Sequence, residues 1–240
     1  STFSSGGIES VAYDYFVNGT LIDSGSIDYI AYGTKMYGCT AHIQDVSYAD
    51  LEGQAIYTSD YYEGSYELSN LTVDSVGSGT SSNSALYFYN YSYSYPTSVW
   101  MSSVAVTNAQ GGSALSAIST SYGTMSLEAT DLTIDGAPGN GMTLSGENLT
   151  ASIQYAEIEN VDNLGLSSED TTLTLTDSVI SGAGTSGVEL LSGSKLTFSN
   201  NTVSSSAEYG LICGDVDIID CSDNTYSKNA SGDTLSCPSE

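Results

Sequence analysis

From residue 40 onward, the sequence repeats one pattern of short alternating segments. A clear copy has Leu173 and Leu175 separated by one residue, Asp177 two positions later, and Ile180 three positions after that. The next two copies follow at a period of 23 residues, and earlier copies follow at spacings of 22 to 33. Alternation of apolar and polar residues is typical of short strands, and a repeat of this length is typical of a solenoid. We therefore expect each copy to form one coil that pairs with the coils on either side.

Alignment of eight copies gives three apolar columns, which we expect to point into the solenoid. The first column is Ala41, Tyr66, Val99, Leu127, Ala151, Leu173, Leu196 and Ile219. The second is Ile43, Leu68, Met101, Ala129, Ile153, Leu175, Phe198 and Cys221. The fourth is Tyr48, Val73, Val106, Ile134, Ile158, Ile180, Val203 and Tyr226.

The remaining third column is polar. It contains Asp45, Asn70, Ser103, Asp131, Tyr155, Asp177, Asn200 and Asp223. Asp and Asn tolerate left-handed backbone angles and bond to nearby main chain, so we expect a tight corner between two short strands here. A second strand then begins at a small residue that eases a bend. These small residues are Ala55, Ala85, Ala114, Gly141, Gly165, Gly187 and Gly210.

The repeat resembles the right-handed parallel β-helix superfamily, the pectin-lyase-like fold, over about residues 40–237. The resemblance implies an all-β, single-stranded right-handed parallel β-helix of about eight coils or more. We assign residues 40–240 to this solenoid. Residues 1–39 register poorly, and they are expected to be an N-terminal cap, a degenerate coil or an assembly segment that covers the open strand edges.

The charge balance limits the partners of the chain. Three Lys, no Arg and 29 Asp plus Glu give a formal net charge of −26. Binding to nucleic acid or to an anionic membrane surface relies on Lys and Arg, so neither is expected as a partner. No apolar run is long enough to insert into a membrane. Such an anionic chain attracts cations, of which Ca²⁺ is a candidate.

Catalysis is not favoured by the residues present. The resemblance implies that pectin-cleaving relatives use a basic residue, with Ca²⁺ or Arg to neutralise the substrate carboxylate. Here Lys35, Lys195 and Lys228 are scattered and Arg is absent, and the net charge would repel a polyuronate. Pectin elimination is therefore disfavoured.

Outward carboxylates on successive coils leave three interpretations open. Asp135 and Glu159 follow inward residues at equivalent positions, and Asp74 occupies the same place on an earlier coil. Stacked strands are about 4.8 Å apart, so such carboxylates could act as a glycosidase pair on a neutral glycan. They could instead hold Ca²⁺, or form a solvated acidic face.

Tyrosine is concentrated in the first half of the chain. The segment YFYNYSYSYPTSVW, residues 87–100, alternates Tyr with other residues. If it is extended, its tyrosines share one face and, with Trp100, could contact a protein or a sugar. These tyrosines are Tyr87, Tyr89, Tyr91, Tyr93 and Tyr95. The alternative is that they are ordinary strand residues.

Three of the four cysteines lie in the last 28 residues, which favours a disulfide-stapled C-terminal end in an oxidising compartment; the alternative is that all four are small buried side chains. Cys213 and Cys237 are 24 residues apart, nearly one coil, so we expect them to lie on adjacent turns and to form a disulfide. Cys39 and Cys221 are expected to be buried thiols.

These observations predict a non-catalytic structural or adhesive β-helix protein, secreted or at the cell surface. It is expected to bind copies of itself, as a filament or surface-layer subunit, or an extracellular glycan. A glycan-active hydrolase or a glycan-binding module is the alternative.

Overall fold

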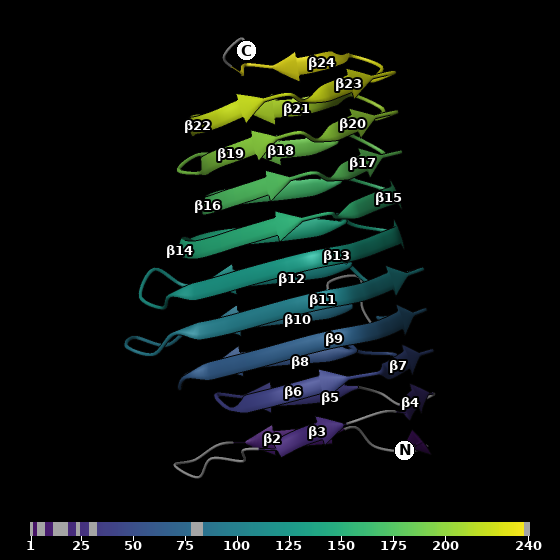
Figure 1. Cartoon of the computed structure of the whole chain (residues 1–240), viewed down its shortest axis with the longest axis vertical. Coiled ribbons are helices and arrows are strands. Elements are labelled where there is room, and N and C mark those ends of the chain that lie inside the picture. Colours follow the sequence, from purple (N-terminus) through teal and green to yellow (C-terminus); the bar gives the residue numbers. More distant parts are fainter. Residues whose placement is uncertain are drawn as a thin grey trace.

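The chain forms a parallel β-solenoid whose strands pair with equivalent strands one coil away. The structure, a computed structural model, describes residues 2–3, 8–11, 19–22, 25–28, 33–77 and 84–237, and only the backbone of those before residue 33. Figure 1 shows the coils stacked along one axis, from β2 and β3 near one end to β24 at the other. Regular structure in these ranges consists of strands alone. No helix in the described part of the chain could cross a membrane.

Each coil contributes to three faces of the solenoid. The first face contains β2 (Ile8–Val11), β5 (Thr34–Tyr37), β8 (Ile56–Asp60), β10 (Leu86–Asn90), β12 (Leu115–Ser119), the first parts of β14 (Met142–Gln154) and β16 (Leu166–Thr176), β18 (Val188–Leu190), β21 (Tyr209–Cys213) and β24 (Gly232–Leu235). The second contains β3 (Gly19–Ile22), β6 (Thr40–Gln44), the first parts of β9 (Gly64–Asp74), β11 (Thr97–Thr107) and β13 (Met125–Ala137), the second parts of β14 and β16, β19 (Lys195–Ser199) and β22 (Asp217–Ser222). The third contains β1 (Thr2–Phe3), β4 (Gly25–Asp28), β7 (Val46–Ala49), the second parts of β9, β11 and β13, β15 (Glu157–Val161), β17 (Val179–Ser181), β20 (Thr202–Ser204) and β23 (Thr225–Ser227).

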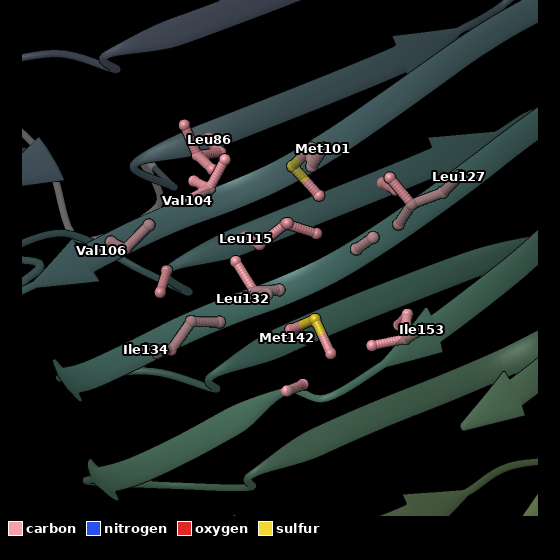
Figure 2. Close-up of a cluster of buried hydrophobic side chains, with 14 of the residues drawn as sticks. Leu86, Met101, Val104, Val106, Leu115, Leu127, Leu132, Ile134, Met142 and Ile153 are labelled. Atoms are coloured by element: carbon pink, nitrogen blue, oxygen red, sulfur yellow. The ribbon is translucent and has the colours of Figure 1, made fainter. Parts of the chain in front are cut away.

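The predicted apolar columns form the core. Strand pairing places their members opposite one another from coil to coil, as in the row that joins Met101, Ala129 and Ile153. Nearly all of these side chains are buried. Figure 2 shows part of this core, with Met101, Leu127 and Ile153 packed between the faces. Burial of each large apolar side chain contributes about 1.5–3 kcal/mol, so the columns supply most of the force that closes the coils.

One member of the first column is misplaced. The register shifts in β22, so that Ile218 pairs with Leu196 and Asp220 pairs with Thr197. Ile219 therefore points outward and is 63% exposed, while Ile218 packs against the core. The prediction that Ile219 points inward is wrong because this bulge adds one residue to the strand.

The predicted corner column is confirmed. All eight members have left-handed backbone angles, with φ between 52° and 58°. The Asp and Asn members are Asp45, Asn70, Asp131, Asp177, Asn200 and Asp223. Asn70 donates a hydrogen bond from Nδ2 to Asp45, and Asn200 does the same to Asp177. The amides thus link successive coils at this corner.

A second left-handed corner follows the third face, and the sequence pattern did not indicate it. Its members are Asp50, Ser75, Asn108, Gly136, Asn160, Gly182, Ser205 and Lys228. Its residue types are too varied to form a recognisable column, although both corners have the same backbone geometry.

The column of small residues lies where neighbouring coils approach closely. A Cβ atom added to Gly165 would lie 2.4 Å from the carbonyl oxygen of Gly187 and 2.4 Å from a methyl group of Ile180. The backbone N–H of Gly165 also donates to the carbonyl of Ser186 in the next coil. Steric crowding between coils therefore explains the absence of a larger side chain there.

Strands that precede residue 40 continue the stack. β4 pairs with β7, β3 with β6, and β2 with β5, all in parallel. This backbone arrangement is that of a further coil, one of the three alternatives for residues 1–39. The side chains of residues 1–32 lie outside the described residues, so a cap or assembly role for this segment stays a prediction.

Candidate functional site: a tyrosine surface

Tyrosines from three consecutive coils lie side by side on the first face. Tyr57 on β8 and Tyr87 on β10 are opposite one another in register, and their rings stack with centroids 5.5 Å apart and planes 9° apart. Tyr37 on β5 packs edge-on against Tyr57 at 6.0 Å. The Nζ atom of Lys35 lies 5.8 Å from the centre of the Tyr57 ring, within the range of a cation–π contact.

The ring contacts continue around the corner that follows the first face. Eight tyrosines form one unbroken series in which successive ring centroids are 5.3–6.3 Å apart. We call this series the tyrosine surface; in order of contact it consists of Tyr37, Tyr57, Tyr87, Tyr89, Tyr91, Tyr61, Tyr62 and Tyr95. Tyr93 and Tyr122 form a separate stacked pair at 4.7 Å. Aromatic pairs at these separations attract one another beyond their buried area.

Burial favours the neutral form of two phenols of this surface. Burial is the largest cause that raises the pKa of Tyr87, and the neighbouring Tyr57 and Tyr89 raise it further. Burial also raises the pKa of Tyr91. Because an ordinary tyrosine pKa is already about 10, Tyr87 and Tyr91 add no negative charge to an anionic protein at neutral pH.

The expected straight row of five tyrosines is interrupted. Strand β10 ends at Asn90, whose buried side chain donates to the backbone oxygens of Tyr95 and Thr124 and accepts from the N–H of Ser92. These bonds fold residues 91–96 into a compact loop. The prediction of one extended face is therefore wrong beyond Asn90: Tyr93 packs against the next coil, and Tyr95 packs against Tyr62 of the previous one.

Trp100 lies apart from the tyrosine surface. It is exposed on β11, in the second face, between Glu67 of the previous coil and Glu128 of the next. Its grouping with the tyrosines came from proximity in sequence, but the corner between the first and second faces separates them.

The predicted carboxylate neighbours lie in one row of the third face. Asp135 is opposite Glu159, as expected, whereas Asp74 is opposite Thr107, which separates it from Asp135 by one coil. Asp135 accepts a hydrogen bond of 2.8 Å from the Asn160 amide, and Glu159 accepts one of 2.9 Å from a hydroxyl on the following coil. Neutral donors thus satisfy one oxygen of each carboxylate.

Asp74 is stabilised as an anion by the coil above it. Asn108 and Thr107 donate to its Oδ1 at 2.8 and 2.7 Å, and these bonds lower the pKa of Asp74, with Asn108 the larger cause. Within residues 33–77 and 84–237, no three His, Cys, Asp or Glu side chains are grouped to hold a metal ion. A Ca²⁺ site at Asp74, Asp135 and Glu159 stays a prediction.

A comparison with protein families fits this geometry. The family model described as "Right handed beta helix region" matches residues 116–237, just over half of the chain. The chain belongs to this family. No curated protein and no solved structure matches it significantly.

The C-terminal coils of this right-handed β-helix carry the predicted disulfide. Cys213 on β21 and Cys237 after β24 are joined, with their Cα atoms 4.9 Å apart. The bond ties together adjacent coils, as the spacing of nearly one coil predicted. Cys39 is buried and Cys221 is partly buried.

Two buried polar residues that anchor the tyrosine-bearing loops were not identified from the sequence. Asp60 ends β8 and occupies the same register position as Asn90 in β10. Its carboxylate accepts hydrogen bonds from the Gly38 N–H at 2.7 Å, the Tyr66 hydroxyl at 2.5 Å and the Thr97 hydroxyl at 2.8 Å. Asp60 and Asn90 could have been identified from the sequence, because each is a polar residue at an inward position of its strand and directly precedes a tyrosine-rich loop.

The tyrosine surface also extends beyond residues 87–100, the tyrosine-rich segment identified from the sequence. Tyr57, Tyr61 and Tyr62 belong to it although they lie one coil before residues 87–95. Alignment of the coils could have revealed them, because Tyr57 and Tyr87 hold equivalent positions in the repeat.

Proposed function

We propose that this right-handed β-helix is a non-catalytic structural or adhesive protein, secreted or at the cell surface, that associates with copies of itself through the tyrosine surface. The observation that carries the proposal is the unbroken series of eight tyrosines across three coils. A rigid scaffold fixes these rings, so their burial in a contact costs little side-chain entropy. Tyrosine is enriched at protein interfaces because it offers apolar area together with a hydroxyl group.

The charge of the protein suggests how this association would be controlled. A net charge of −26 makes copies repel one another at low ionic strength. Salt screens exposed charges beyond about 10 Å at 0.1 M, whereas contacts between neutral phenols are not weakened by screening. Association through the tyrosine surface should therefore increase with salt concentration.

We expect light scattering to detect growth in particle mass as NaCl is raised. The double variant Tyr61→Ser, Tyr91→Ser removes two exposed rings that contact each other at 5.6 Å, and it should remain monomeric at salt concentrations where the wild type associates. Tyr155→Ser is the matched control, because Tyr155 is exposed at a corner where Ser103 holds the equivalent position. This control should associate like the wild type.

Two results would contradict self-association through this surface. One is a wild type that stays monomeric at every salt concentration. The other is equal association of the double variant and the wild type.

A comparison of CaCl₂ with NaCl at the same ionic strength distinguishes charge screening from a calcium site. A larger increase in association with CaCl₂ than with NaCl, lost in Asp135→Asn, would support the predicted Ca²⁺ ligands.

A second candidate function is hydrolysis of a neutral glycan, favoured by the register that sets Asp135 opposite Glu159. Adjacent carboxylates could serve as acid and base, although each already accepts a neutral hydrogen bond. If this pair is catalytic, Asp135→Asn and Glu159→Gln should each abolish the release of reducing ends from a panel of neutral glycans. Turnover that survives in both variants, or absence of turnover in the wild type, would exclude the pair.

A further inference from the structure

The closest ring contact of the described residues joins two loops of consecutive coils. Tyr93 lies in the loop between β10 and β11, and Tyr122 lies in the loop between β12 and β13. Their ring centroids are 4.7 Å apart with planes 30° apart, whereas the other tyrosine pairs are separated by 5.3 Å or more. Tyr93 is 66% exposed and Tyr122 is 63% exposed. The pair thus combines close contact with access for a reagent from solvent.

We propose that Tyr93 and Tyr122 are a site of oxidative coupling to an intrachain dityrosine by an external haem peroxidase with hydrogen peroxide. Each phenol loses one electron and its hydroxyl proton to give a neutral radical. A carbon–carbon bond then forms between the Cε atoms next to the two oxygens. The Cε hydrogens leave as protons while the phenolic oxygens are reprotonated. Overall, two phenols lose two electrons and two protons, and one hydrogen peroxide accepts them to give two water molecules.

The structure favours this pair over the other tyrosines. Tyr48 and Tyr66 are fully buried and out of reach of an oxidant. Tyr57 and Tyr87 stack closely, but both are half-buried on strands, which fix their backbone positions. Side chains on exposed loops can rotate from a stacked to an edge contact, which the new bond requires. The other contacting loop tyrosines, Tyr61, Tyr62, Tyr91 and Tyr95, are only 37–47% exposed, and their ring centroids are 5.3–6.0 Å apart.

Such a bond would link neighbouring coils at their tyrosine-bearing corner. The Cys213–Cys237 disulfide links adjacent coils at the C-terminal end, far from this corner in the stack. The inference does not depend on self-association, because both rings belong to one chain.

The positions of methionine make the cross-link easy to locate. Cleavage after Met101 and Met125 releases fragment 102–125, whose only tyrosine is Tyr122, and separates it from the fragment that holds Tyr93. Both methionines are almost fully buried, so the folded protein shields them from peroxide. We expect dilute protein treated with peroxidase and peroxide to keep its monomeric mass, to show dityrosine fluorescence, and to yield fragment 102–125 joined to fragment 37–101. Fragmentation by mass spectrometry should place the link at Tyr93.

Three variants decide the assignment. Tyr122→Phe should lose the joined fragment and most of the early fluorescence, and Tyr93→Phe should do the same. Tyr155→Phe, which removes an exposed tyrosine at the corner after the second face, should leave both unchanged. The proposal is overturned if fragment 102–125 is released free after oxidation, if the link maps to another tyrosine, or if coupling joins only separate chains. Oxidation confined to Trp100 would overturn it as well.

Discussion

Replacement of Asn201 by alanine is expected to lower the free energy of unfolding by about 1–3 kcal/mol, because it leaves the buried N–H of Ser178 without its partner. Asn201 is only 1% exposed. Its Oδ1 accepts from the N–H of Ser178 at 2.9 Å, and its Nδ2 donates to the carbonyl of Leu175 at 2.9 Å. The substitution therefore leaves the Ser178 N–H, one coil earlier, unsatisfied and removes one bond from the Leu175 carbonyl. Urea unfolding followed by circular dichroism measures the change.

The residues around Asn201 suggest two matched control variants. Ser178 holds the equivalent position one coil earlier, where its hydroxyl accepts from the Ala156 N–H and donates to the Thr176 carbonyl. Asn201→Ser should therefore be milder than Asn201→Ala. Asn200→Gly removes only an exposed bond at a left-handed residue, and should change stability by less than about 1 kcal/mol. If Asn200→Gly proves as costly as Asn201→Ala, the inward amide is not what holds these coils together.

Asn200 and Asn201 also show which structural roles could be predicted from the sequence repeat and which could not. Asn200 was assigned correctly because six of the eight members of its column are Asp or Asn, a composition that left-handed corners select. Asn201 was missed, although it aligns with Ser178 and Asn224, because these polar residues point inward where alternation leads one to expect an apolar side chain. The core columns were predictable because every coil needs apolar side chains at the same inward positions.

The arrangement of the tyrosines was less predictable for a different reason. Strand residues such as Tyr87 and Tyr89 follow alternation, so their outward direction could be predicted. The contacts of Tyr93 and Tyr95 depend on a loop whose shape is set by the buried amide of Asn90. Loop geometry has no repeat to reveal it, and neither does a single inserted residue such as the one that turns Ile219 outward.

Replacement of Asp60 by asparagine is expected to remove a pH dependence of stability of about 3 kcal/mol between pH 4 and pH 6. Burial is the largest cause that raises the pKa of Asp60, to about 6, and outweighs the hydrogen bonds from Tyr66, Gly38 and Thr97 that lower it. In this window the folded protein holds a proton that the unfolded chain, with an ordinary carboxyl pKa near 4, has released. Stability contributed by Asp60 is therefore present below pH 4 and is lost as the pH rises through 6.

Asparagine should fit this site because Asn90 occupies the same register position one coil later. The amide oxygen can still accept from Gly38 and Tyr66, and the Thr97 hydroxyl can turn to accept from the new NH₂ group. The measurement is the difference in unfolding free energy between wild type and variant across pH, which cancels the effect of the other carboxylates. Asp74→Asn provides the opposite sign: the lowered pKa of Asp74 contributes stability that is present above pH 4 and is lost as the pH falls below it. A difference curve for Asp60→Asn that stays flat from pH 4 to pH 7 would mean that Asp60 is ionised in the fold throughout this range, held as an anion by its three donors despite its burial.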